Sequence, residues 1–353
     1  MASDPATLPF VSIVLPVRNE GKRFEETLDR VLAQDYPASL MEVLVVDGLS
    51  DDATPEVVRA VAARDARVRL LANPGRIVPP AMNIGIRSAK GDVVVRIDGH
   101  TRIAADYVRR CVEALRASGA SCAGGRMDTV GRTFVGRLVA AATSGRFGVG
   151  DSAFHYADTP RFTETVYMGA WPREALVRVG GFDEEMVRDQ DDELNYRIRK
   201  QGGTVWLDPS IRSEYTPRGS FVKLWKQYYE YGYWKVRVFQ KHPSMMRWRH
   251  FVPAAFVASG IAAVAMLAFP WAPWVLAAGA ALYAAAAAVA AAVAHASLVE
   301  KLALPSVYFT IHSAYGAGFL VGLVRFLPRW FHDRPWRGLQ AALPQTGFEE
   351  NER

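Results

Sequence analysis

Residues 42–64, EVLVVDGLSDDATPEVVRAVAAR, contain the pattern that decides the fold of this chain. The β-branched run that ends at Asp47 predicts a buried strand, and the stretch after Thr54 predicts a helix. Further strands are predicted at residues 10–16, 68–71 and 92–97, and further helices at 19–33, 80–89 and 107–118. Strands that alternate with helices indicate an α/β domain with a mostly parallel sheet, whose ligands bind beyond the carboxyl ends of the strands.

Charged residues are missing from two long stretches in the C-terminal third of the sequence. Residues 251–299 and 302–324 contain no Asp, Glu, Lys or Arg, although such residues make up 22% of the 353-residue chain. About 20 apolar residues suffice for a helix to cross a bilayer. The chain is therefore expected to be a membrane protein rather than a wholly soluble one, and a hydrophobic content of 50% excludes disorder.

The longer uncharged stretch predicts a hairpin of two crossings, 251–269 and 274–296, because the prolines of FPWAPW interrupt the helix between them. A third segment, 302–327, has small residues at every fourth position, which allows close helix packing. These residues are Ala314, Gly318 and Gly322. Three full crossings would place Arg325 and later arginines on the outer side, against the positive-inside tendency. A re-entrant or interfacial third segment therefore stays open.

Residues 218–250 are rich in Lys, Arg, Trp and Tyr and adjoin the uncharged region, which predicts interfacial helices on the cytoplasmic side. The net charge of +6 is thus assigned to an anionic membrane surface rather than to nucleic acid. The expected organisation is a catalytic domain, interfacial helices, transmembrane helices and a polar tail. Their boundaries are 1–217, 218–250, 251–327 and 328–353.

Two features place the N-terminal domain in the cytosol. Cys111 and Cys122 give neither a disulfide framework nor a C-x-x-C metal motif, which suits a reducing compartment. The start of the chain, MASDPATLPF, also lacks the basic and apolar segments of a signal peptide. We therefore expect a multi-pass protein of the plasma (inner) membrane with a cytoplasmic catalytic domain.

Acidic residues at three separate places could carry chemistry. Asp47 and Asp98 each end a predicted strand, and the cluster DQDDE at residues 189–193 opens a predicted helix. Each could instead cap a helix or form a turn, as could His100. Together, the three acids suit group transfer from a nucleotide diphosphate: one would hold a divalent cation, one would contact the nucleoside, and one would take a proton from the attacking hydroxyl.

Five motifs follow one another in an order that resembles the inverting family 2 glycosyltransferases with a GT-A fold. They are PVRNE (16–20), VVDGLSDDAT (45–54), PAMNIG (80–85), RIDGH (96–100) and QDDELNYRIRKQG (190–202). A closer resemblance, to membrane glycosyltransferases of bacterial exopolysaccharide assembly such as the succinoglycan biosynthesis glucosyltransferase, adds LDPSIRSEYTPRGS (207–220) and QYYEYGYWK (227–235). The resemblance implies a GT-A catalytic domain, and its motifs cover about residues 10–240.

The resemblance also implies roles for individual residues. By resemblance, the residues expected to bind the donor nucleotide are Pro16, Asn19, Glu20, Asp47 and Asn83. Asp98 and His100 are expected to bind a divalent cation, Mn²⁺ or Mg²⁺, and Asp191 is expected to be the catalytic base. Arg218 could bind the donor diphosphate or an acceptor lipid phosphate, or simply attract anionic lipid.

The chain departs from the family pattern in three motifs. His100 replaces the second Asp of the metal motif, and Gln190 replaces the Glu before the base. Glu230 and Tyr231 replace the Arg and Trp of an acceptor motif, which disfavours a processive polymer synthase.

The expected activity is transfer of a hexose, with UDP as the expected nucleotide, to a polyprenyl-linked saccharide in exopolysaccharide or cell-surface glycan biosynthesis. The expected partners are the nucleotide sugar, the lipid-linked acceptor, membrane lipid and other assembly enzymes. Transfer directly onto polyprenyl phosphate and a catalytically silent membrane scaffold are the alternatives.

Overall fold

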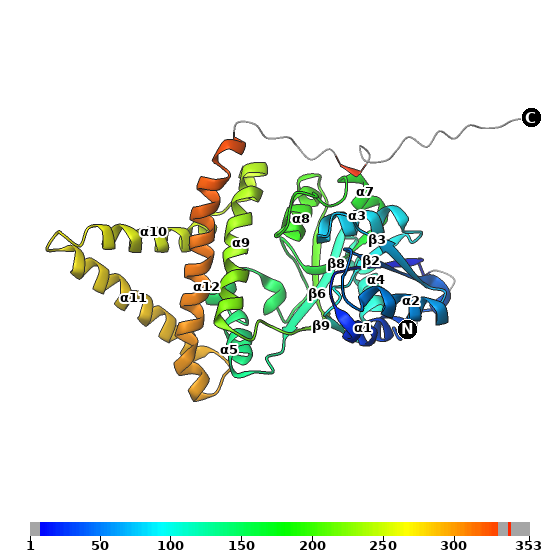
Figure 1. Cartoon of the computed structure of the whole chain (residues 1–353), viewed down its shortest axis with the longest axis horizontal. Helices are drawn as coiled ribbons and strands as arrows, with labels where there is room; N and C mark the ends of the chain where they lie inside the picture. The colour runs from blue at the N-terminus through cyan, green and yellow to red at the C-terminus, as the bar shows by residue number, and fades with distance from the viewer. Residues whose placement is uncertain (1–7, 331–337, 340–353) are drawn as a thin grey trace, which may run out of the picture.

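The computed structural model describes residues 8–330 and 338–339 (Figure 1). Most of the predicted polar tail, including Arg334 and Arg337, lies outside the described residues, as does the start of the chain. The described chain has a head, which contains the sheet and the helices on its two faces, and a group of long C-terminal helices beside it (Figure 1).

The sheet has nine strands in the order β3-β2-β1-β4-β8-β6-β9-β5, with β7 paired to β9. The strands are β1 (Val11–Val17), β2 (Met41–Asp47), β3 (Val68–Ala72), β4 (Val93–Arg96), β5 (Arg102–Ile103), β6 (Cys122–Thr129), β7 (Arg161–Phe162), β8 (Tyr167–Pro172) and β9 (Val205–Tyr215). Strands β3, β2, β1 and β4 are parallel, whereas β8 pairs antiparallel with both β4 and β6. The sheet is therefore mixed: β3, β2, β1 and β4 have the parallel arrangement expected from the sequence and β6 and β9 also pair in parallel, whereas β8, β5 and β7 run antiparallel to their neighbours.

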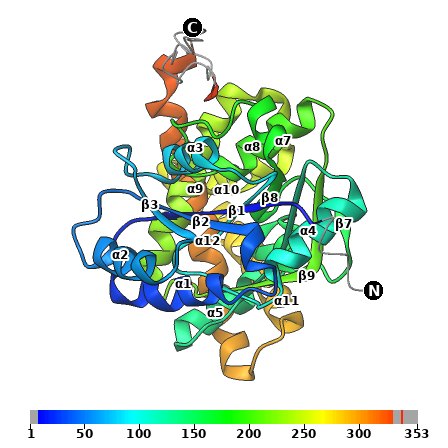
Figure 2. The ribbon, with the colours of Figure 1, turned by 90° about the vertical axis from the view of Figure 1, so that its right-hand side faces the viewer.

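Helices cover both faces of the sheet because neighbouring residues of its strands point to opposite sides (Figure 2). Ile13 and Leu15 face a core shared with α1 (Phe24–Leu32), α2 (Thr54–Arg64) and α4 (Tyr107–Ser118). Val14 faces a second core shared with α3 (Val78–Ser88), α7 (Arg173–Arg178) and α8 (Gln190–Lys200). These helices and the first four strands confirm the predicted α/β pattern.

The segment between Gly119 and Pro172, for which the sequence predicted no elements, completes the sheet and supplies helices beside it. It contains β6, β7, β8, α5 (Phe134–Thr143) and α6 (Arg146–Val149). Because β8 enters between β4 and β6, it brings Tyr167 and Met168 next to the end of β4.

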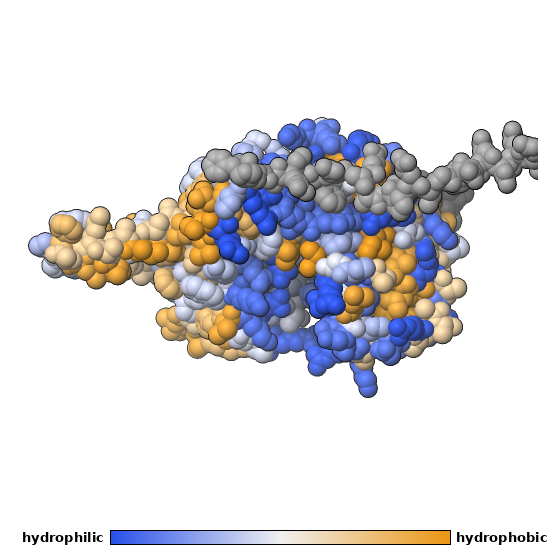
Figure 3. All heavy atoms as spheres, turned by 45° about the horizontal axis from the view of Figure 1, so that its top comes forward, coloured by the Kyte–Doolittle hydropathy of each residue, from blue (hydrophilic) through white to orange (hydrophobic). Residues whose placement is uncertain are grey.

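Three C-terminal helices are long and apolar enough to cross a membrane, namely α10 (Val252–Ala265) with its preceding turn, α11 (Ala272–Val293) and α12 (Leu298–Arg325). The helix break at FPWAPW is confirmed, since α10 ends at Ala265 and α11 begins at Ala272. The α10–α11 hairpin projects away from the head (Figure 1), and its surface is mainly apolar (Figure 3).

Helix α9 (Phe221–Lys241) packs closely against α12. A Cβ atom on Gly318 would lie 2.0 Å from the carbonyl oxygen of Tyr229, and one on Gly232 would lie 2.0 Å from that of Tyr315. Only glycine permits such an approach of two backbones, so the predicted close packing of the small residues of α12 is confirmed, with α9 as the partner.

Candidate active site

The carboxyl end of β4 and the first turn of α8 meet at one arginine. Arg96, the last residue of β4, is 4% exposed, and its Nε donates to Oδ1 of Asp98 at 2.8 Å. Its Nη1 donates to Oδ1 of Asp191 at 2.5 Å. The structure thus brings together two acids that are 93 positions apart in the sequence, the predicted cation ligand and the predicted base.

Asp98 is held as an anion. Burial alone would raise its pKa, but Arg96 and His100 outweigh burial and lower it below the ordinary value. The Tyr167 hydroxyl, whose own pKa is raised by burial, donates to Oδ2 of Asp98 at 3.3 Å. Asp98 therefore offers a permanent negative charge at the strand end.

Asp191 has a different electrostatic environment. Burial raises its pKa to about 6, and the nearby negative charge of Asp98 acts in the same direction, while Arg96 opposes both. A carboxylate with a pKa near 6 is ionised at neutral pH and is a stronger proton acceptor than an ordinary aspartate. This is the property that a general base requires.

His100 and Glu20 lie together beside Asp98. The Nδ1 atom of His100 is 3.4 Å from Oε1 of Glu20, and this hydrogen bond raises the pKa of His100 against the effect of burial. Arg218 lies close enough to lower the pKa of His100. The predicted residue Arg218 is thus near the same corner of the site.

The residues at this corner fit a divalent cation that is completed by substrate. Among the described residues, no group of three or more His, Cys, Asp or Glu side chains is arranged to hold a metal ion. Oδ2 of Asp98 is contacted by Tyr167 rather than by Arg96, and His100 supplies a nitrogen beside it. Mg²⁺ and Mn²⁺ commonly bind through one or two protein ligands and substrate phosphates, which is what this donor set allows.

Helix α9 holds the segment that carries Asp191. Lys235 of α9 is buried, and its Nζ lies 2.9 Å from Oδ1 of Asp189 and 2.7 Å from Oδ2 of Asp192. Asp189 also adopts a left-handed backbone conformation, with φ of 59°. Asp189 and Asp192, which lie on either side of Asp191 in the sequence, are therefore held by a helix that is not part of the α/β layers.

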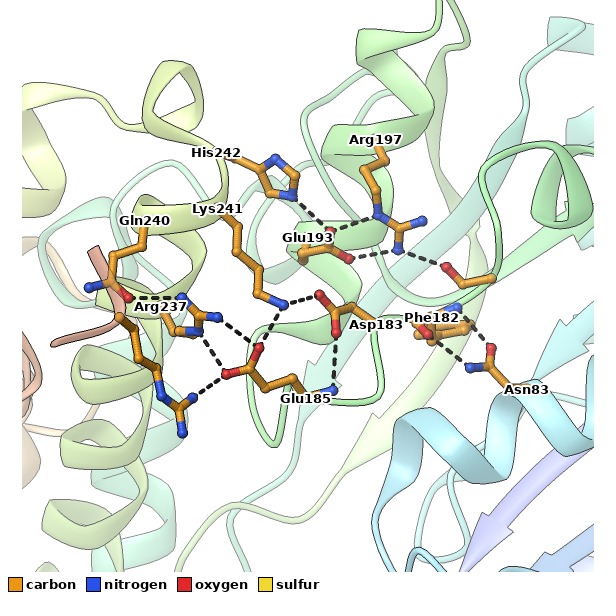
Figure 4. Close-up of polar contacts among 12 residues, drawn as sticks. Asn83, Phe182, Asp183, Glu185, Glu193, Arg197, Arg237, Gln240, Lys241 and His242 are labelled. Carbon is orange, nitrogen blue, oxygen red and sulfur yellow. Dashed lines mark hydrogen bonds and ion pairs between the residues drawn. The ribbon is translucent and has the colours of Figure 1, made fainter. Parts of the chain in front are cut away.

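A second set of ion pairs extends this contact towards the end of α9 (Figure 4). Arg237 donates to both carboxylate oxygens of Glu185, at 2.8 and 2.9 Å. Glu193 accepts from Arg197 on one side, and its Oε1 lies 2.8 Å from Nε2 of His242 on the other. The stretch from residue 183 to 193 is thus tied to α9 along its whole length.

The predicted nucleotide-binding residues occupy two kinds of position. Pro16 and Glu20 line a cavity of about 1310 Å³ together with Asp98, His100, Asp191 and Arg218. Asn19, Asp47 and Asn83 are not part of its described lining. Asp47 accepts from the Ser50 amide and hydroxyl at 3.0 and 2.5 Å, in the loop before α2, and it does not cap that helix, whose N-cap is Ala53, so the helix-capping alternative for Asp47 is wrong. Its contact with a nucleoside remains a prediction.

Asn83 has a position that the sequence did not indicate. Its side chain accepts from the Phe182 amide and donates to the Phe182 carbonyl oxygen, both at 2.8 Å (Figure 4). It also donates to Glu184 at 2.8 Å. These contacts anchor the segment before Asp183 to α3. Asn83 therefore supports the segment that leads to Asp191, and its contact with the donor remains a prediction.

Arg96, Tyr167 and Lys235 were not among the predicted site residues. A signal for Arg96 was present, because it is the one charge inside the apolar strand sequence VVVRI. Lys235 had no comparable signal in a stretch of many basic residues, and Tyr167 lies where no strand was predicted.

Comparisons with known proteins agree with this architecture. The family model described as Glycosyl transferase family 2 matches residues 12–174. Succinoglycan biosynthesis protein ExoA of Rhizobium meliloti (strain 1021) is 33% identical over 257 residues, which cover 72% of this chain and 78% of that protein. The chain belongs to glycosyltransferase family 2. The resemblance seen in the motifs is thereby confirmed, and this family 2 member is a glycosyltransferase.

Two further proteins resemble this family 2 member over most of its length. A Methanococcus voltae protein, dolichyl N-acetyl-alpha-D-glucosaminyl phosphate 3-beta-D-2,3-diacetamido-2,3-dideoxy-beta-D-glucuronosyltransferase, is 26% identical over 90% of this chain and 98% of its own. The solved structure of mannosyltransferase PcManGT from Pyrobaculum calidifontis, in complex with GDP-Man and Mn²⁺, covers 91% of this chain and 88% of its own, with a TM-score of 0.58 and 23% identity. That structural likeness shows a shared GT-A-like fold.

Proposed function

We propose that this protein is an inverting, metal-dependent glycosyltransferase that moves a hexose from a nucleotide sugar to a lipid-linked saccharide at the inner face of the plasma membrane. The observation that supports it best is the pair Asp98 and Asp191, joined by Arg96 in one cavity. A UDP-hexose is the first donor to test. GDP-linked donors belong in the same panel, because PcManGT was crystallised with GDP-Man.

In the proposed reaction, Asp191 takes the proton from an acceptor hydroxyl as that oxygen attacks the anomeric carbon. The bond between this carbon and the donor phosphate oxygen breaks, and its electron pair leaves with the nucleoside diphosphate. Attack from the face opposite the leaving group inverts the anomeric configuration, so an α-linked donor gives a β-linked product. A divalent cation at Asp98 and His100 would stabilise charge on the leaving diphosphate, to which Arg218 is also well placed to bind.

The extent of the cavity supports a lipid-linked acceptor. Its lining continues from the acids to Lys223 and Lys226 of α9, and further to Phe256, Tyr283 and Ile311 of the hydrophobic helices. Lysines suit a phosphate, and the apolar side chains suit a lipid chain. The name of the Methanococcus voltae relative likewise describes a lipid-linked sugar phosphate.

Incubation of the full-length protein with radiolabelled nucleotide sugars, Mn²⁺ and a membrane lipid extract tests the proposal. We expect release of nucleoside diphosphate together with sugar transfer into a lipid-linked saccharide. The absence of both across a broad donor panel would contradict the proposal and favour a silent scaffold.

The identity of the labelled lipid separates the two enzymatic alternatives. A product with one sugar on polyprenyl phosphate would favour the alternative acceptor. That alternative is supported by a relative named undecaprenyl-phosphate 4-deoxy-4-formamido-L-arabinose transferase, from Edwardsiella ictaluri (strain 93-146), which is 34% identical over 115 residues, or 32% of this chain and 35% of that protein. Elongation of a lipid-linked saccharide would favour the main proposal.

A further inference from the structure

Helix α12 is long enough to cross a bilayer, but its contacts disagree with a crossing. Its 28 residues span about 42 Å, which exceeds the ~30 Å hydrocarbon core. A helix that crosses would have one end beside the cytosolic head and the other end across the membrane. The head therefore could contact only one end of such a helix.

The first end of α12 is bound to the head. Glu300, in the first turn, accepts from Nε of Arg137 at 2.7 Å. Arg137 lies on α5, which begins five residues after strand β6 of the central sheet ends. Leu304 and Val307 of α12 belong to the same buried cluster as Leu138 of α5. The cluster also contains Ala287 and Ala291 near the end of α11, so this end of α12 packs between α5 and the base of the hairpin.

The middle and the second end of α12 are also bound to the head. The carbonyl oxygen of Phe147, on α6, is 2.8 Å from Nε2 of His312. Arg329, four residues beyond the helix, forms an ion pair with Glu185, in the segment that leads to Asp191. Helix α5, helix α6 and the segment that leads to Asp191 therefore contact α12 at its start, its middle and its second end, which disagrees with a helix whose second end lies across the membrane.

Burial distinguishes α12 from the hairpin. In the most apolar stretch of α12, 56% of the residues are buried. The corresponding values are 6% for the α10 segment and 11% for α11. The large apolar residues that α12 exposes fall within one side of the helix by their spacing. They are Leu298, Val299, Leu302, Phe309, Val321 and Val324. One side of α12 thus packs on protein and the other side is apolar and open.

We infer that α10 and α11 alone, among the described residues, enter the hydrocarbon core, and that α12 lies along the membrane interface on the same side as the head. The exposed apolar side of α12 would rest at the boundary between lipid headgroups and acyl chains, as amphipathic interfacial helices do. The occupant of this surface is the lipid bilayer. The arrangement returns Arg325 and Arg329 to the side of the head, in agreement with the positive-inside tendency.

Labelling of single cysteines in native membranes tests this topology with the full-length chain. The two natural cysteines are fully buried, so an impermeant maleimide should give little background. Lys200→Cys, on the exposed end of α8, reports the side of the head. We expect Arg325→Cys to react from the same side as Lys200→Cys. Reaction of Arg325→Cys from the opposite side would overturn the inference.

A cysteine at the hairpin tip provides the contrasting position. Trp271→Cys should react from the side opposite Lys200→Cys, or be protected from both sides if the tip stays in the lipid. Labelling of Trp271→Cys from the head side alone would overturn the insertion of the hairpin.

Cross-linking checks that the labelled protein has the packing described. In membranes, a short bismaleimide should join Arg137→Cys to Glu300→Cys, and in a separate variant Glu185→Cys to Arg329→Cys. A crossing helix permits only the first cross-link, so failure of the second in a protein that forms the first would also contradict the inference.

Discussion

Asp98 and Asp191 share the guanidinium of Arg96, but different parts of the molecule hold them. Asp98 follows β4 and is fixed within the sheet, through Arg96 and Tyr167. Asp191 lies in the first turn of α8, between two aspartates that are paired with Lys235 of α9. The first carboxylate is thus positioned by the α/β domain alone, and the second depends on a helix that packs against α12.

Their electrostatics differ as well. The pKa of Asp98 is lowered despite burial, because Arg96 and His100 stabilise its charge, whereas burial raises the pKa of Asp191 to about 6. A permanent anion suits cation binding, and a carboxylate that titrates near neutral pH suits proton transfer. Two aspartates that share one arginine can therefore serve different tasks, one in cation binding and one in proton transfer.

The largest expected effect is on the base. Asp191→Asn keeps the shape of the side chain but cannot accept a proton, so we expect kcat to fall by about 10² to 10⁴ while donor affinity is retained. Steady-state transfer rates and calorimetric donor binding measure the two quantities. Glu174→Gln, an exposed change on α7, is the matched control and should keep the wild-type rate. Folded Asp191→Asn protein with a near-normal kcat would remove this residue from the mechanism.

The second expected effect is on donor binding at the strand end. Asp98→Ala removes the anionic ligand, and we expect the Mn²⁺-dependent part of donor affinity to fall by roughly 10- to 100-fold. Titration of donor with and without Mn²⁺ measures this difference. Unchanged affinity in Asp98→Ala, or full wild-type activity in excess chelator, would show that Asp98 is structural and that Arg218 or another cation stabilises the diphosphate.

The Asp98 region could be predicted from the sequence to a much greater extent than the Asp191 region. Local patterns define it, because an apolar run predicts β4, and the residues that follow a parallel strand must lie at the ligand-binding edge. The same reasoning correctly predicted β1, β2 and the helices between them. The motif around Asp191 predicted helix α8, but the position of the first turn of α8 also depends on Lys235 of α9 and on Arg96 of β4, which are distant in sequence.

The contacts of the two aspartates that flank Asp191 escaped prediction for a physical reason. The sequence 218–250 contains many basic residues, and their number and order do not distinguish buried Lys235 from exposed Lys223 or Lys226. Which of them turns inward is decided by the packing of α9 against α12, through Gly232 and Gly318. Likewise, the sequence contained no clear pattern for β8, so the neighbours of Asp98 on that strand could not be assigned.

A third prediction concerns the shared arginine. Arg96 opposes protonation of Asp191, so Arg96→Met should raise the pKa of Asp191 further above about 6 and move the acidic limb of the kcat profile to higher pH. At a fixed assay pH below both the original and the raised pKa, the rate falls about tenfold for each unit of that shift. Arg96→Lys, which keeps the charge, should shift the limb less. A lower rate with an unmoved limb would indicate that Arg96 acts on packing alone.

The smallest expected effect concerns His100, which departs from the family pattern at the cation site. The hydrogen bond to Glu20 raises the pKa of His100 above 6.5, so the imidazole gains its proton, and loses its ability to bind a cation, as the pH falls through this raised pKa. His100→Asp should therefore weaken the pH dependence of Mn²⁺ affinity between pH 6 and 8, while the limb of kcat near pH 6 that belongs to Asp191 persists. Because imidazole favours Mn²⁺ over Mg²⁺, the same variant should also shift the preference towards Mg²⁺, by up to about tenfold. Metal titrations at several pH values separate the change in pH dependence from the change in metal preference. An unchanged pH dependence of Mn²⁺ affinity in His100→Asp would exclude His100 as a ligand and leave Asp98 as the protein group that binds the cation.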